Sequence, residues 1–185
     1  MSFQIKAFIF ILISTGLVWI SWPSLKNIRS HGLYRFFAWE SILAMVMYNL
    51  DNWFYKPFSV YQLISWILLL ISLLMVIYGY QSIRLSGMPD SSRIDPSLRG
   101  IEKTTELVTS GAYRYIRHPL YSSILFGAWG VFFKRITLLS VCLAVITTLS
   151  VIITAKIEEV ENIRFFGQAY REYMRKTRML IPFIY

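Results

Sequence analysis

Long apolar runs alternate with short polar segments along the chain, a pattern typical of a helical membrane protein. The runs 61–80 and 136–155 contain no charged residue, and 3–22 contains only Lys6, near its outer end. A bilayer core about 30 Å thick needs about 20 helical residues whose backbone groups are satisfied within the segment. Each of these three runs is therefore predicted to be a membrane-spanning helix.

A weaker apolar run covers 36–50 and contains Glu40 and Asn49. A charge near the centre of a span costs about 2.5–3.5 kcal/mol on insertion scales, so Glu40 is a candidate functional residue. An equally open interpretation is that Glu40 lies close enough to the interface to pair with Arg35. We count this run as a fourth predicted span.

The fifth predicted span, 119–133, is short but uncharged, and only Lys134 and Arg135 separate it from the run that follows. The last two spans should therefore form a tight antiparallel hairpin. Cytoplasmic loops carry an excess of Lys and Arg. With the N-terminus outside and the C-terminus cytosolic, the inner side holds 15 of the 19 Lys and Arg residues. The outer side holds Lys6, Lys56, Lys134 and Arg135.

Two polar segments lie on the predicted cytosolic side. The connection 81–117 is rich in Gly and Pro; we expect turns over 90–100 and a short helix or an extended strip over 101–108. Residues 156–176 have apolar positions at helical spacing with charges between them, which predicts an amphipathic helix, broken or bent at Gly167. The predicted fold is an all-α membrane protein with five transmembrane helices and a cytosolic C-terminal amphipathic helix.

Composition agrees with this pattern. The 185 residues are 56% apolar and 16% charged, whereas a water-facing surface needs about a quarter of residues charged. The formal charge of +9 alone is compatible with nucleic acid, anionic lipid or an acidic substrate. Because most of the basic excess follows the predicted topology, a nucleic-acid partner is not needed to explain it.

The segment 110–121, SGAYRYIRHPLY, is the first candidate site. Pro119 can begin a helix because its missing N–H falls in the first turn. His118 would then lie beside a helix N-terminus, where backbone N–H groups favour an anion, and Arg114 and Arg117 add positive charge. The alternative is that these arginines and the neighbouring tyrosines are ordinary interfacial anchors.

The second candidate site is Glu158-Glu159, directly after the charge-free run 136–155. Carboxylates at a membrane boundary should face water, a cation or a partner. The hairpin places the start of one span near the end of the next, so His118 and Glu158 should come close together. An anion site facing a carboxylate suits a zwitterion such as an amino acid. The alternative is a solvated pair near Lys156 or Arg164.

The motifs for nucleotide-binding loops, serine hydrolases and paired histidine ligands are absent from the sequence. The single cysteine excludes a clustered-cysteine zinc site, and no metal is expected. His31 and His118 are isolated from each other, and we interpret His31 as a loop residue.

Taken together, ELVTSGAYRYIRHPLY and the later EEVENIRFFGQAYREYMRKTRMLIPFI resemble the family of integral-membrane methyltransferases that contains isoprenylcysteine carboxyl methyltransferases and phospholipid N-methyltransferases. The resemblance covers residues 98–184. Its signature is RHPxY, paired glutamates, FFG, YxEY and IPFI in this order. The first three spans match the family only in hydropathy.

The resemblance implies that S-adenosylmethionine binds on the cytosolic side, between the last two spans and the C-terminal segment. It places Glu158 on the amino group of the cofactor, and it gives low-ranking substrate roles to Lys156, Glu159 and Arg117. The other cofactor-binding positions that it implies are Thr105, Glu106, Leu107, Val108, Tyr113, His118, Pro119, Leu120 and Tyr121. No general base is evident.

Two positions depart from the eukaryotic isoprenylcysteine enzymes. Ser123 stands where they often have glycine, and Thr154 stands where they have an arginine thought to contact a substrate carboxylate. A carboxylate acceptor is therefore less well supported than the methyltransferase class.

We accordingly expect one integral-membrane domain over 1–185. Residues 1–80 would form three N-terminal spans, and 81–185 the loop, hairpin and C-terminal segment of a methyltransferase site. The expected function is S-adenosylmethionine-dependent methyl transfer to a lipophilic or membrane-delivered acceptor, with membrane lipid as a further partner. The alternative is a non-catalytic membrane protein, such as an assembly or transporter subunit, that binds anionic lipid. The sequence leaves the oligomeric state and the acceptor atom open.

Overall fold

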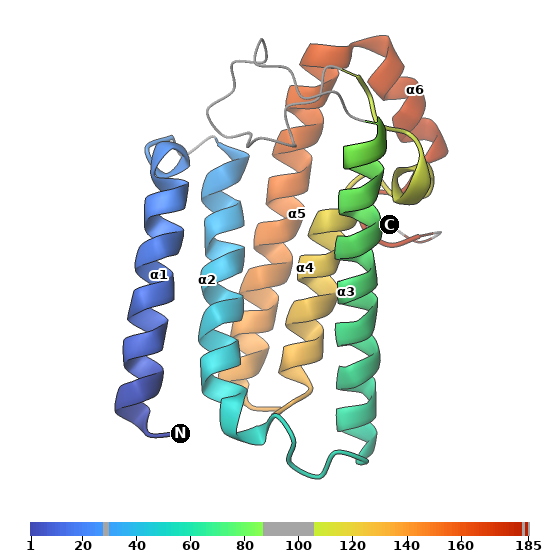
Figure 1. Ribbon diagram of the computed structural model, residues 1–185. Coiled ribbons are helices and arrows are strands. Elements are labelled where there is room, and N and C mark those ends of the chain that lie inside the picture. The colour runs from blue at the N-terminus through green and yellow to red at the C-terminus, as the bar shows by residue number, and fades with distance from the viewer. Residues whose placement is uncertain (28–29, 87–105, 183, 185) are drawn as a thin grey trace.

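A computed structural model describes residues 1–27, 30–86, 106–182 and 184, and most of them are helical (Figure 1). The helices are α1 (Phe3–Leu25), α2 (His31–Asn49), η1 (Leu50–Asn52), α3 (Val60–Ser86), η3 (Gly111–Arg114), α4 (Pro119–Phe132), α5 (Leu138–Phe166) and α6 (Gln168–Lys176). The described ranges contain no β-strand, and Ile116 and Arg178 form an isolated parallel bridge. For these ranges the all-α prediction is confirmed.

Three helices, α1, α3 and α5, are long and apolar enough to cross a membrane. Large apolar side chains such as Phe8, Ile67 and Leu149 are exposed along them, as expected for surfaces that face lipid. The apolar helix α4 is shorter, with 14 residues. Helices α1 to α5 lie side by side (Figure 1), but membrane crossing by α2 and α4 stays a prediction.

Helix α2 begins earlier than the predicted span 36–50. Ser30 is the N-cap residue, and its hydroxyl accepts a hydrogen bond from Gly32 N at 3.2 Å. The prediction that His31 is a loop residue is wrong: His31 is the first residue of α2 and has no exposed surface. A Cβ atom on Gly32 would lie 2.4 Å from Ser24 Oγ, so the end of α1 contacts the start of α2 at a distance only glycine permits.

The C-terminal amphipathic helix differs from the prediction. Helix α5 continues without interruption from the apolar run to Phe166, and the chain then turns at Gly167, whose φ is +60°. The predicted break at Gly167 is confirmed, but a single helix over 156–176 is wrong, because its first half extends α5. The separate helix α6 buries Tyr170 and Tyr173.

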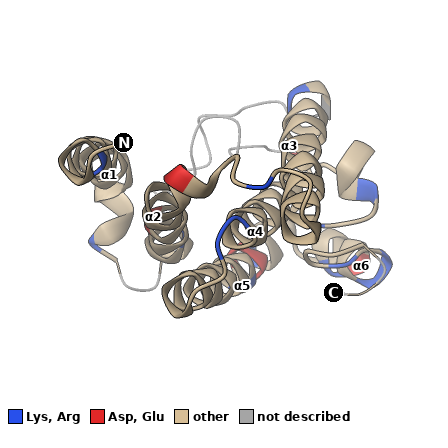
Figure 2. Ribbon diagram, turned by 90° about the horizontal axis from the view of Figure 1, so that it is seen from below, with Lys and Arg blue, Asp and Glu red and all other residues tan. Residues whose placement is uncertain are grey.

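Small residues bring the central helices close together. Ala38 of α2, Ala128 of α4 and Ala155 of α5 have no exposed surface, which allows the short backbone separations typical of membrane helix interfaces. Helix α3 is joined to α4 by Ser65, whose hydroxyl donates to Gly130 O at 2.7 Å. Figure 2 views the bundle end-on and shows α1 at one edge and α6 at the other.

The predicted α4–α5 hairpin is confirmed. Only residues 133–137 connect the two helices, and within them Lys134 is almost fully buried, with 4% of its surface exposed. Its ammonium group lies 3.3 Å from the centroid of the Trp66 ring and donates to Gln62 Oε1 at 3.0 Å. The start of α4 and the end of α5 therefore lie at the same end of the bundle.

Some predicted features lie outside the described residues. These are the turns expected over 90–100 and most of the segment 101–108, including Thr105.

Candidate functional site

The chain segment after α6 fixes the start of α4. Arg117 N donates to Arg178 O at 2.8 Å, and His118 N donates to Met179 O at 3.2 Å. Helix α4 then begins with His118 as N-cap and Pro119 in its first turn, as predicted. One turn later Ser122 Oγ donates to Leu180 O at 2.5 Å. One segment that is distant in sequence, residues 178–180, thus holds the α4 N-terminus in place.

Glu158, on α5, faces this N-terminus. Tyr121 donates its hydroxyl proton to Glu158 Oε2 at 2.5 Å, and Glu158 Oε1 lies 3.9 Å from His118 Nδ1. The rings of His118 and Tyr121 are stacked, with centroids 5.4 Å apart. The expected proximity of His118 and Glu158 is confirmed. The Glu158 side chain is partly buried, with 21% of its surface exposed.

The neighbouring carboxylate, Glu159, has a different environment. It forms an ion pair with Arg117, whose Nε lies 2.5 Å from Glu159 Oε1. The same guanidinium donates through Nη1 to Thr177 O at 2.5 Å and to Met174 O at 3.3 Å. Arg117 and Glu159 are therefore engaged with the end of α6, which makes them anchors for this helix.

A second histidine, His31, contacts an α5 carboxylate from α2, and no sequence motif indicates it as a site residue. His31 Nδ1 is 2.7 Å from Glu161 Oε2. A serine directly before an apolar-periodic run is a helix-start signal, so Ser30 could have revealed that His31 begins a helix. Its partner is 130 positions away, and no local pattern indicates that contact.

The remaining predicted residues surround the site at different distances. Tyr113 lies on η3, and its carbonyl oxygen accepts a hydrogen bond from the Tyr173 hydroxyl at 2.6 Å. Burial raises the pKa of Tyr173, which keeps the phenol protonated as a donor. Lys156 is exposed and stands two residues before Glu158, a spacing at which helical side chains point in different directions.

In the segment that precedes η3, the three predicted residues that the structure describes differ in burial. Glu106 is exposed, Leu107 is half-buried and Val108 is buried. In the first turn of α4, Pro119 is buried and Leu120 is half-buried. These residues keep their predicted cofactor roles as predictions only.

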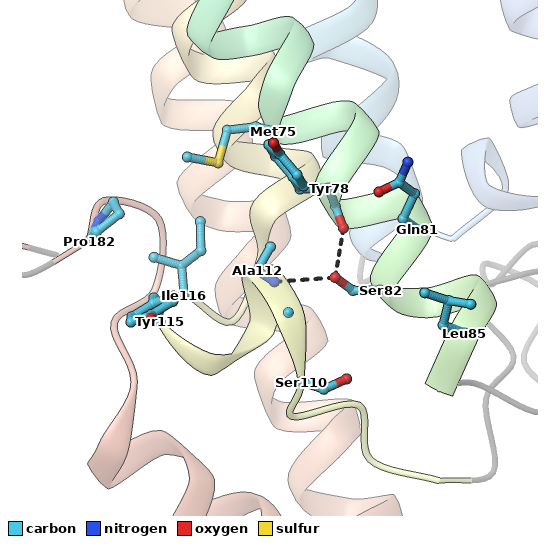
Figure 3. Close-up of a pocket in the computed structure, with 11 residues that line it drawn as sticks. Met75, Tyr78, Gln81, Ser82, Leu85, Ser110, Ala112, Tyr115, Ile116 and Pro182 are labelled. Atoms are coloured by element: carbon cyan, nitrogen blue, oxygen red, sulfur yellow. Dashed lines mark hydrogen bonds between the residues drawn. The ribbon is translucent and has the colours of Figure 1, made fainter.

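An apolar pocket of about 840 Å³ lies at the same end of the bundle (Figure 3). One wall is the last part of α3, and the opposite wall is formed by η3, the residues after it and the C-terminal segment. The lining residues are Met75, Tyr78, Gln81, Ser82, Leu85, Ser110, Gly111, Ala112, Tyr115, Ile116 and Pro182. Ile116 lies two residues before His118, so one short segment contributes to both the pocket and the carboxylate site.

The donor set fits a zwitterionic ligand such as the amino-acid end of S-adenosylmethionine. Glu158 provides a carboxylate that suits an ammonium group, and the α4 N-terminus beside it favours a carboxylate. His118 Nε2 is buried and lies 3.6 Å from Glu159 Oε1, beyond hydrogen-bond length. The site thus contains a partner of each sign within one turn of α4 and one turn of α5.

Comparison with known proteins gives named relatives. The methanethiol S-methyltransferase of Crocosphaera subtropica is 25% identical over 158 residues, which cover 80% of this chain and 55% of that protein. The protein-S-isoprenylcysteine O-methyltransferase of Xenopus laevis is 31% identical over 125 residues, which cover 65% of this chain and 42% of that protein. The chain thus spans about half the length of these curated relatives. No solved structure matches the chain at a significant level.

The family model for phospholipid methyltransferase matches residues 60–169, which is more than half of the chain. This range includes α3, the His118 segment, the hairpin and both glutamates, and it confirms the resemblance found in the sequence motifs. The chain belongs to the phospholipid methyltransferase family.

Proposed function

We propose that the protein is an integral-membrane methyltransferase that uses S-adenosylmethionine and methylates a lipophilic or membrane-delivered acceptor. The observation that carries this proposal is the contact of the partly buried Glu158 side chain with Tyr121 and His118 at the start of α4. The family membership supports the reaction class.

In this proposal Glu158 binds the amino group of the cofactor, and the first turn of α4 together with His118 binds its carboxylate. Tyr121 positions Glu158 through its hydrogen bond. The bound cofactor supplies an activated methyl group on its sulfonium. The protein then has to orient an incoming nucleophile and exclude water. Positioning of the two reactants can by itself accelerate the methyl transfer strongly.

The pocket between α3 and η3 is proposed to hold the apolar part of the acceptor. Its walls combine apolar side chains such as Met75, Leu85 and Ile116 with few polar groups, which is typical of sites for small apolar molecules. Two relatives are named for methanethiol and for protein isoprenylcysteine as acceptors, and both acceptors contain sulfur. A comparable acceptor is proposed here.

The proposed topology has five spans, with the N-terminus outside and the carboxylate site at the cytosolic face. The excess of Lys and Arg on the loops at the α6 end of the bundle supports this orientation. The cofactor then enters from the cytosol, and the acceptor enters sideways from the membrane.

The first test is titration calorimetry of S-adenosylmethionine on detergent-purified protein. Replacing Glu158 by Gln removes the negative charge that is proposed to bind the amino group of the cofactor. Loss of one partner of a charge pair costs about 2–5 kcal/mol. We therefore expect Glu158→Gln to weaken cofactor binding at least about tenfold. The matched control is Glu172→Gln, the same change at an exposed position of α6, which should leave binding unchanged. Absence of wild-type binding at millimolar cofactor would contradict the enzyme proposal and favour the non-catalytic alternative.

The acceptor class needs a separate experiment. Membranes containing the protein are supplied with radiolabelled cofactor and with a prenylcysteine, phosphatidylethanolamine or a small thiol. Transfer of the label to one of these compounds by the wild type, and no transfer by Glu158→Gln, would identify the class of acceptor. Binding of cofactor without transfer to any of the three would leave the cofactor site standing and reject these acceptors.

A further inference from the structure

His31 is a buried histidine that lies outside the part of the chain matched by the family, residues 60–169. It is the first residue of α2 and has no exposed surface. A polar side chain is costly to bury unless it is hydrogen-bonded. Its surroundings therefore require an explanation beyond membrane crossing by α2.

The contacts of His31 are with α5. Its Nδ1 lies 2.7 Å from Glu161 Oε2; since an ionised carboxylate can only accept, Nδ1 carries the proton and donates it. The backbone oxygen of His31 lies 3.4 Å from Thr154 Oγ1, which is also on α5. The start of α2 is thus attached to α5 on both sides of the turn that carries Glu158.

This turn contains the proposed cofactor ligand. Glu158 and Glu161 are three residues apart on α5, so their side chains leave the helix on the same face. His31 contacts Glu161, so it lies beside the α5 turn that carries Glu158. From the α4 side, Glu158 contacts Tyr121 and His118. The α5 turn that carries Glu158 and Glu161 therefore contacts a histidine of α2 and a histidine of α4.

The groups that face His31 define its electrostatic environment. Glu161 and Glu158 of α5 attract a positive imidazole, and Arg35, one turn along α2, repels it. The α2 N-terminus adds a positive dipole end that favours the Glu161 carboxylate next to it. Glu161 is thus favoured both by the imidazole of His31 and by the start of α2.

We propose that His31 is a positioning residue for the cofactor site: through Glu161 it fixes the α5 turn that carries Glu158. This inference rests on the proposed function. It assigns the N-terminal spans a part in ligand binding, because α2 supplies one side of the carboxylate site.

The test measures S-adenosylmethionine affinity by calorimetry and thermal stability in detergent for the same proteins. We expect His31→Ala to weaken binding about tenfold, and His31→Gln, which can still donate to Glu161, to recover part of that loss. The matched control is Asn49→Ala at the other end of α2. Asn49 is also fully buried and donates to Val131 O at 3.0 Å. The Asn49→Ala substitution should lower the thermal stability and leave the affinity for S-adenosylmethionine unchanged.

A double-mutant comparison separates positioning from general support of the fold. If His31 acts through Glu158, His31→Gln has no further effect on affinity when Glu158 is already Gln. A purely structural role would weaken binding equally in both backgrounds and would overturn the proposal. Wild-type affinity in both His31 variants would overturn it as well, while leaving the proposed function intact. Absence of binding by the wild type would reject both.

Discussion

Lys134 is a cation enclosed at the end of the bundle opposite the carboxylate site. Its ammonium lies between the rings of Trp66, at 3.3 Å, and Trp53, at 5.1 Å, measured to the ring centroids. Desolvation by burial lowers the pKa of Lys134 from 10.5 to about 8. The rings and Gln62 offset part of the cost of burying the charge, so this residue ties α3 to the α4–α5 connection at a net electrostatic cost.

The depressed pKa of Lys134 predicts a specific pH dependence of stability. Between about pH 8 and 10.5 the unfolded chain binds a proton that the folded protein has released, so the free energy of unfolding rises with pH, by at most about 1.4 kcal/mol per pH unit. Below pH 8 the full burial cost remains. Lys134→Met, which has no charge to bury, should lack this rise.

The measurement is thermal unfolding of both proteins in detergent from pH 7 to 9.5. The stability of the wild type should increase relative to Lys134→Met as the pH rises. Burial also raises the pKa of Tyr170 and Tyr173, which lowers stability only above the ordinary tyrosine range and affects both proteins alike. Parallel curves would contradict the assignment of the shift to Lys134.

Among the elements, η3 depends on one close approach to α3. Ser82 Oγ donates to Tyr78 O at 2.6 Å and accepts from Ala112 N at 3.2 Å (Figure 3). Gly111 makes this possible in two ways: its φ is +59°, and a Cβ atom there would lie 2.2 Å from Ser82 Oγ. One side of the pocket is therefore set by a glycine.

We expect Gly111→Ala to destabilise the protein by about 1–3 kcal/mol, because left-handed backbone and a side-chain clash both disfavour alanine. The matched control is Gly16→Ala in α1, where nothing lies within 4 Å of the new Cβ; this change should be neutral or slightly stabilising. Thermal unfolding measures both. Equal effects of the two substitutions on stability would show that η3 does not need the close contact between Gly111 and Ser82.

At the scale of the whole molecule, orientation in the membrane is open to a labelling test. With Cys142 replaced by Ala, single cysteines are placed at Phe58, between η1 and α3, and at Arg171 on α6; both positions are exposed. A membrane-impermeant maleimide should label Phe58→Cys on intact cells and Arg171→Cys only after permeabilisation. The reverse order would invert the topology, and labelling of both on intact cells would contradict the three spans proposed between these two positions.

The sequence predicts the parts of this molecule that local patterns determine. Apolar runs located the long helices, Pro119 located the start of α4, and the short Lys134-Arg135 connection brought His118 to Glu158. The burial of His31 against Glu161 depends on packing between helices that are distant in sequence, so no window of residues contains it. For the same reason the engagement of Arg117 with Glu159 and the end of α6 could not be predicted.

The length of α4 has a consequence for where chemistry would occur. Its 14 residues extend about 21 Å, some 9 Å less than the hydrocarbon thickness of about 30 Å. With α4 placed across the membrane as proposed, its first turn lies recessed below the inner headgroups. The proposed cofactor, which is water-soluble, would then bind at the depth in the bilayer at which the proposed lipophilic acceptor is dissolved. Bilayers with longer acyl chains increase that depth, so turnover should depend on membrane thickness.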